Sequence, residues 1–323
     1  MRVRLVAWVL GLLAAGCGAQ APAAVLDAAA VADAAVVPDA APAPLSFEQR
    51  KQRLQGILGS VRMRLFKGDL DGATALVDQA AAVAGDEELF VNAVAGDRAM
   101  VLAYRQDFAG ASRVLAERIA RLPAASRHVF IFENTRVMLE TAAGDVDAAL
   151  AACDAMTAAG RRPPWSDDAD ARTFVELKEH WHRAYLLRMR AATLKGKERA
   201  AALAAAEAAR KAYKTLAGSA GKEHRDSIAV LDGYFAVHAS DKRAALAAAR
   251  QVDARADDDL EDLYLNQLAF DAGGDAAMAS TVRARMVGLH SISIADAVTR
   301  VWVARDAAAP ATRSPRHPEA PLP

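Results

Sequence analysis

Apolar side chains recur at helical spacing along most of the chain. The residue pair Ser46 and Gln49 matches a capping box, the pattern that begins a helix, and Lys67-Gly68 matches a helix end. Strand-like alternation is confined to His290–Ile294, which is too short to outweigh the helical pattern after it. The sequence therefore predicts an all-α body over residues 46–306. The first expected helix carries one apolar face: Leu54, Ile57, Leu58, Val61 and Leu65.

A short signature recurs between the expected helices. Its glycine can adopt the left-handed conformation that ends one helix, its aspartate can cap the next, and its final alanine lets two helices approach closely. Such units cannot bury their apolar faces alone and stack on their neighbours, which predicts an α-solenoid of antiparallel helix-turn-helix repeats. Three clear copies spaced 38 residues apart are followed by three weaker ones: Gly68–Ala73, Gln106–Ala111, Gly144–Ala149, Gly196–Ala201, Ser240–Ala245 and Gly274–Ala279.

The turn at Gly68–Ala73 resembles that of tetratricopeptide-repeat proteins, whose second helix commonly begins after a Gly-Asp-aromatic-x-x-Ala turn. Ala80 lies where that family has its second small residue. The family period is about 34 residues, and the family's Trp, Leu-Gly and Tyr pattern and boundary proline are missing here. The resemblance covers the turns as a motif and most of residues 46–305 as architecture. It implies tetratricopeptide-like repeats, and a non-repeating helical bundle is the alternative.

Paired prolines interrupt the pattern after the third unit. Pro163 and Pro164 cannot continue a helix, and Ser166 is expected to cap a long helix from about residue 167 to 195. Three regular units thus precede a longer and less regular half. We expect one continuous superhelix with a kink at this position.

The N-terminal segment has the features of a cleaved secretory signal. It begins with Arg2 and Arg4, continues with an apolar stretch that is shorter than the roughly 20 residues of a membrane-spanning helix, and ends at Cys17. This segment resembles the signal peptide of bacterial lipoproteins, although Ala14 stands where that family usually has leucine. The resemblance implies a signal peptide over residues 1–16 and a lipidated Cys17. An ordinary secretory signal cleaved nearby is the alternative.

Low-complexity segments flank the expected body. Residues 17–45 are rich in alanine and proline without helical or strand periodicity, and residues 307–323 are rich in proline. Both are expected to be disordered, the first as a tether behind the lipid anchor. In lipoproteins, aspartate directly after the lipidated cysteine favours the inner membrane. Gly18 occupies this position, so the resemblance implies the outer membrane.

Charge and cysteine content narrow the possible functions. The chain has 40 basic and 40 acidic residues, and removal of Arg2 and Arg4 with the signal leaves a net charge near −2. This balance gives no electrostatic footprint for nucleic acid or for an anionic lipid surface. Cys153, the second cysteine, is expected to be a small buried hydrophobe on a helix. A catalytic or redox role for its thiol is the alternative.

Candidate chemistry is concentrated in one helical stretch. Glu176 and His180 are four residues apart and share a helix face, whereas His182 diverges from that face. A metal site here would need a third ligand from elsewhere, so a solvated face with ion pairs is the preferred interpretation. The acidic run Asp257–Asp262 is interpreted as a helix start. We expect no catalytic residue, metal or cofactor.

These features favour a membrane-anchored envelope lipoprotein, not an enzyme, whose repeat body binds a protein or peptide partner as a scaffold or assembly factor. Two alternatives stay open. One is an enzyme acting on a small ligand or a glycan, with a site between helices of residues 165–305, and the other is a passive structural lipoprotein. The candidate partner-binding residues lie in the first three units: Arg98, Tyr104, Arg105, Arg136 and Glu140.

Overall fold

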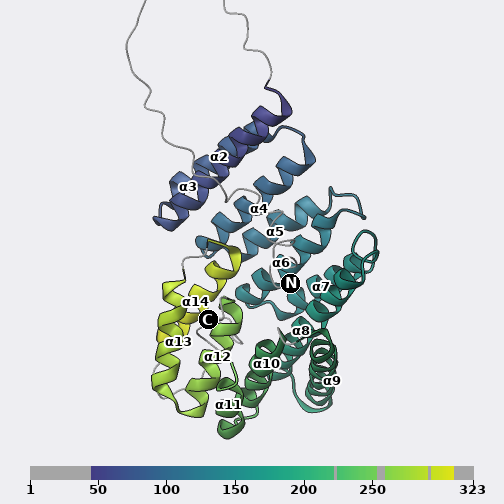
Figure 1. The fold of residues 1–323 in the computed structure, drawn as a ribbon, viewed down its shortest axis with the longest axis vertical. Helices are drawn as coiled ribbons and strands as arrows, with labels where there is room; N and C mark the ends of the chain where they lie inside the picture. The colour runs from purple at the N-terminus through teal and green to yellow at the C-terminus, as the bar shows by residue number, and fades with distance from the viewer. Residues whose placement is uncertain (1–44, 222–223, 253–258, 290–291, 309–323) are drawn as a thin grey trace, which may run out of the picture.

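The computed structural model describes residues 45–221, 224–252, 259–289 and 292–308, and within these ranges it contains thirteen α-helices and no strand (Figure 1). The predicted signal peptide, Cys17 and almost all of the predicted tether lie outside the described residues. None of the described helices is both long and apolar enough to cross a membrane. The helices are α2 (Phe47–Phe66), α3 (Leu70–Ala84), α4 (Glu88–Tyr104), α5 (Phe108–Ile119), α6 (Arg127–Ala143), α7 (Val146–Gly160), α8 (Ala169–Thr193), α9 (Gly196–Ala220), α10 (Arg225–His238), α11 (Lys242–Ala249), α12 (Leu260–Gly273), α13 (Ala276–Gly288) and α14 (Ile294–Ala308).

Consecutive helices pair into hairpins that stack on one another. The pairs are α2/α3, α4/α5, α6/α7, α8/α9, α10/α11 and α12/α13, and each of the six turns lies at one copy of the sequence signature. The first helix begins with the expected capping box at Ser46 and buries four of the five predicted apolar side chains. The all-α fold of stacked helical hairpins, an α-solenoid, is therefore confirmed.

Five of the six turns share one hydrogen-bonding scheme. Their first residue has a left-handed φ even where it is not glycine, at 62° for Gln106 and 58° for Ser240. The aspartate that follows accepts a hydrogen bond from the third residue of the next helix, as Asp69 does from the Gly72 N–H at 2.9 Å. Its own N–H reaches back to the carbonyl five residues earlier, which satisfies a free helix-end acceptor. The alanine that ends each of these five copies is almost completely buried: Ala73, Ala111, Ala149, Ala245 and Ala279.

The fourth copy departs from this scheme. Gly196 keeps a left-handed φ of 54°, but Lys197 replaces the capping aspartate, and Lys195 at the cap position makes no side-chain cap hydrogen bond. Ala201, expected to lie between the two helices, is exposed, and Ala202 is buried in its place. Without the aspartate to fix the register, α9 begins at the glycine itself. The predicted role of the last alanine is wrong for this copy.

The helix after the paired prolines also starts later than expected. Asp168, and not Ser166, caps α8 by accepting a hydrogen bond from the Ala171 N–H at 2.9 Å. Trp165 in the preceding turn packs against Phe130 with ring centroids 4.5 Å apart. This aromatic contact packs the proline-containing turn against α6.

The solenoid curves back on itself. In the ring-like arrangement of Figure 1, α14 contacts α4 and α6 of the N-terminal half as well as α12. Ile294 packs against both hydrophobic clusters of the molecule, the one formed by α2–α4 and the larger one of the later helices. Val298 and Trp302 are buried in the larger cluster. The last helix therefore joins the C-terminal end of the repeat array to its second and third hairpins, and it continues past residue 306, where the tail was expected to begin.

Candidate functional site

A groove lies where the fourth and fifth hairpins separate. The long helix α9 packs closely along α8 but touches α10 only in part, and a hollow of about 580 Å³ opens between them. Alanine side chains of α10 and α11 line part of this groove and leave it room. Its larger lining side chains come from α8, α9 and α10, from the N-cap of α11 and from the turn after α11: Arg188, Leu203, Glu207, Arg210, Asp232, Phe235, Asp241 and Gln251.

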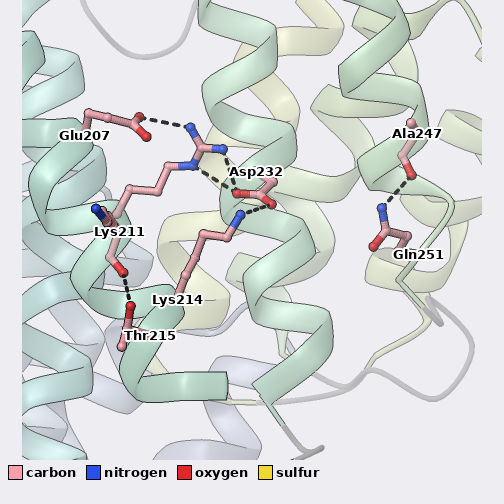
Figure 2. Close-up of polar contacts among 8 residues, drawn as sticks. Glu207, Lys211, Lys214, Thr215, Asp232, Ala247 and Gln251 are labelled. Carbon is pink, nitrogen blue, oxygen red and sulfur yellow. Dashed lines mark hydrogen bonds and ion pairs between the residues drawn. The ribbon is translucent and has the colours of Figure 1, made fainter. Parts of the chain in front are cut away.

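A charged network joins α9 to α10 across the groove (Figure 2). The Asp232 carboxylate accepts hydrogen bonds from Arg210 Nε at 2.9 Å and from Lys214 Nζ at 2.7 Å. Arg210 also donates to Glu207 at 2.9 Å, and its guanidinium carbon lies 4.8 Å from the centre of the Phe235 ring. Because most of these groups are only partly buried, they hold the groove wall by charge and contribute modestly to stability.

Arg188 is a further cation at the groove, and it has no carboxylate partner within the described residues. Its side chain is half-buried, its Nε atom is buried without a hydrogen-bond acceptor, and it forms no ion pair within the described part of the chain. Burial, with the nearby Arg188 charge, lowers the pKa of His238 to about 4. His238 is therefore neutral near pH 7. The planar guanidinium of arginine can bind a carboxylate through two parallel hydrogen bonds. Arg188, which has no ion pair within the described residues, is therefore suited to recognise a carboxylate.

A second hollow of about 330 Å³ continues along α9. It is lined by Lys211 and Thr215 together with Glu207, Arg210 and Lys214 from the network (Figure 2). The two hollows thus carry basic side chains along one helix, next to the alanine-lined part of the groove. The arrangement supplies charge and space for recognition. It brings together no nucleophile with a general base.

The five predicted partner-binding residues lie elsewhere and do not form one site. Arg98 pairs with Asp78 of α3 at 2.7 Å, and Arg105 pairs with Asp71. Tyr104 donates a hydrogen bond to Asp296 of α14. These three residues hold α4 against its neighbours in the same chain.

The other two predicted residues share a network on α6. Arg136 donates to Glu133 at 2.8 Å and lies 3.8 Å from Glu140, which accepts a hydrogen bond from Ser112. Arg136 also donates to the Ser112 hydroxyl at 3.2 Å. Burial raises the pKa of Glu133, and the Arg136 charge opposes that shift. A partner-binding role for these five residues stays a prediction.

The histidine cluster of α8 is divided between the surface and the core. Glu176 is exposed and His180 is half-buried, whereas His182 is 1% exposed. The Nε2 atom of His182 lies 2.9 Å from Asn134 Oδ1, and its Nδ1 atom lies 3.2 Å from the Tyr185 hydroxyl. Burial lowers the pKa of His182 to about 3, so its ring is neutral and structural. Among the described residues, no three His, Cys, Asp or Glu side chains are placed to hold a metal ion.

Two further expectations are confirmed. Cys153 is fully buried on α7, and this burial raises the pKa of its thiol to about 12, which excludes a thiolate near neutral pH. Asp259 caps α12 by accepting hydrogen bonds from the N–H groups of Glu261 and Asp262. This is the helix-start role expected for the acidic run, whose residues 257 and 258 lie outside the described ranges.

Sequence reasoning missed the groove. The available signal was the fourth turn, which lacks the aspartate and the buried alanine that fix the other hairpins. Comparison with protein-family models finds no match, and comparison with curated proteins finds no similar sequence. The candidate site therefore depends on the geometry of this chain.

Proposed function

We propose that this chain is a bacterial envelope lipoprotein whose helical-repeat body binds a protein or peptide partner as a scaffold or assembly factor. The observation that carries the proposal is the groove between α9 and α10–α11. Its volume of about 580 Å³ falls within the range of roughly 300–1,000 Å³ that is common for ligand sites. The stacked hairpins provide a rigid frame for such a surface.

The groove chemistry favours a peptide segment with a carboxylate. Arg188 is a half-buried cation that pairs with no carboxylate of the described residues, and the alanine-lined wall of α10 and α11 accepts a chain at close range. The Asp232 carboxylate already pairs with two cations of α9, Arg210 and Lys214. These two cations therefore stabilise the groove wall and are not available to a partner. An incoming carboxylate in the groove would meet the Arg188 guanidinium, and charge-assisted hydrogen bonds of this kind are stronger than those between neutral groups.

Site-specific photo-crosslinking tests this function. A photoreactive residue at Gln251, in the groove, should crosslink one partner in intact cells, and the same residue at the exposed position Thr281 on α13 should not. Arg188→Gln should remove the Gln251 adduct if the partner carries a carboxylate. If position 251 gives no specific adduct, the groove is not a partner site and a passive structural role is favoured.

Membrane anchoring is a separate part of the proposal. The support is the sequence of residues 1–17, in which a basic start, an apolar stretch and small residues precede Cys17. Cys17→Ser should move the cleaved protein from the membrane to the soluble fraction after a high-salt wash, which removes proteins held only by charge. A processed Cys17→Ser protein that stays with salt-washed membranes would contradict lipid anchoring.

A further inference from the structure

The last turn of α2 exposes two large apolar side chains among cations. Met63 is 56% exposed and Phe66 is 55% exposed. They alternate with basic residues in the run Arg62-Met63-Arg64-Leu65-Phe66-Lys67, in which Leu65 is the one buried residue. Exposed apolar residues of this size adjoining charge are the features of an interaction surface.

The segment around this turn is locally basic, although the chain as a whole is nearly neutral. Residues 45–67 contain one acidic residue, Glu48, and six basic ones. Arg62 and Arg64 are partly offset by Asp97 and Asp69, and Lys51 lies 3.5 Å from Glu48. The other three cations have no ion pair within the described ranges, and two of them are exposed: Arg50, Arg53 and Lys67.

No helix of the described chain covers the outer side of α2. Leu54, Ile57, Val61 and Leu65 face α3 and α4, and Met63 lies on the opposite side of the helix. A methyl group added at Gly56 or Gly59, also on that side, would meet no atom within 4 Å. Figure 1 shows α2 at one end of the solenoid, where the chain enters the described body.

We propose that this face of α2 docks onto an anionic lipid surface. Cations attract acidic headgroups, and isolated apolar side chains enter the boundary between headgroups and acyl chains without needing a matching hollow. A protein partner would have to supply such a hollow for Met63 and Phe66 and acidic groups around it. The contact uses no groove residue and does not depend on lipidation of Cys17.

Vesicle co-sedimentation tests this contact with residues 18–323, so that no acyl chain contributes. The protein should sediment with vesicles of equal parts phosphatidylcholine and phosphatidylglycerol, much less with phosphatidylcholine alone, and less as salt is raised. Met63→Ser combined with Phe66→Ser should lower the partition coefficient by about tenfold or more. The matched control replaces two exposed apolar residues of α13, Met278→Ser and Val287→Ser.

A second pair of variants tests the charge contribution. Arg53→Gln with Lys67→Gln should lower the partition coefficient by about twentyfold, whereas Lys242→Gln with Arg243→Gln on the exposed start of α11 should leave it unchanged. Unchanged thermal unfolding will show that each variant is folded. The proposal is overturned if the protein fails to bind anionic vesicles, or if the Met63/Phe66 variant binds them as well as the unsubstituted protein does. An acidic protein would then be the favoured partner of this face. Neither result affects the crosslinking test of the groove.

Discussion

The Tyr104 hydroxyl donates a hydrogen bond to the Asp296 carboxylate, which lies 192 positions later in the chain. Asp296 is 1% exposed and also accepts two hydrogen bonds at 2.9 Å from Arg300, one turn further along α14. Burial, followed by the Asp296 hydrogen bond, raises the pKa of Tyr104, so its hydroxyl keeps the proton that it donates. A sequence candidate for partner recognition thus holds the C-terminal helix against the N-terminal half.

Removing the Tyr104 hydroxyl should weaken the packing of α14 against α4. Tyr104→Phe leaves Asp296 paired with Arg300 but deletes one charge-assisted hydrogen bond, which should lower the free energy of unfolding by about 1.5–3 kcal/mol. Denaturant unfolding measures the loss, and faster amide exchange in α14 would locate it. Arg98→Gln, which breaks an exposed ion pair with Asp78, should change stability by less than about 1 kcal/mol. An equal loss of unfolding free energy in the two variants would contradict a role for Tyr104 in holding α14 against α4.

Two glycines with opposite surroundings should respond oppositely to alanine. A methyl group on Gly273 would lie 2.7 Å from Leu246 Cβ and 3.2 Å from its Cα. Gly273→Ala must therefore displace α11, and it should lower the free energy of unfolding by about 1–3 kcal/mol. Gly56 has open space and a helical backbone, and Gly56→Ala should stabilise by about 0.5–1 kcal/mol. Thermal unfolding of both variants checks the signs. A stabilising Gly273→Ala would show that α11 and α12 are not packed this closely.

Glycine should be favourable where the turn scheme forces another residue into the left-handed region. Gln106 has a φ of 62°, which costs a residue with a Cβ atom about 1–2 kcal/mol. Gln106→Gly should raise the free energy of unfolding by up to about 1 kcal/mol, because the greater freedom of glycine in the unfolded chain offsets part of the gain. Chemical denaturation provides the measurement. A destabilising result would mean that the Gln106 side chain contributes more than its backbone conformation costs.

The buried histidine of α8 should make the protein sensitive to acid. The pKa of His182 falls from 6.5 to about 3 on folding because of burial, so the folded protein binds this proton more weakly than the unfolded chain. Its contribution to stability is therefore present above pH 6.5 and is lost at about 1.4 kcal/mol per pH unit as the pH falls toward 3. His182→Gln, which keeps an amide near Asn134, should flatten the dependence of unfolding free energy on pH between 6 and 4. An unchanged slope would assign the acid sensitivity to other groups.

The regular turns could be predicted because their chemistry is local. A left-handed residue, a capping aspartate and a small residue in one six-residue stretch are enough to end one helix, begin the next and set their distance. The same reasoning failed at Ala201, where the aspartate is missing and the start of the helix shifts. The groove could not be found this way, because it depends on how far α9 diverges from α10 along its whole length.

The sequence by itself determined the helices, the hairpin turns and the buried apolar faces, since caps and helical periodicity act over a few residues. Only the tertiary structure decided where α14 lies and what Tyr104 contacts, because the curvature of a stacked array accumulates over all its hairpins. It also brought Arg188 of α8 to the groove between α9 and α10. Short-range physics built each repeat, and long-range packing placed α14 against α4 and α6 and formed the candidate site.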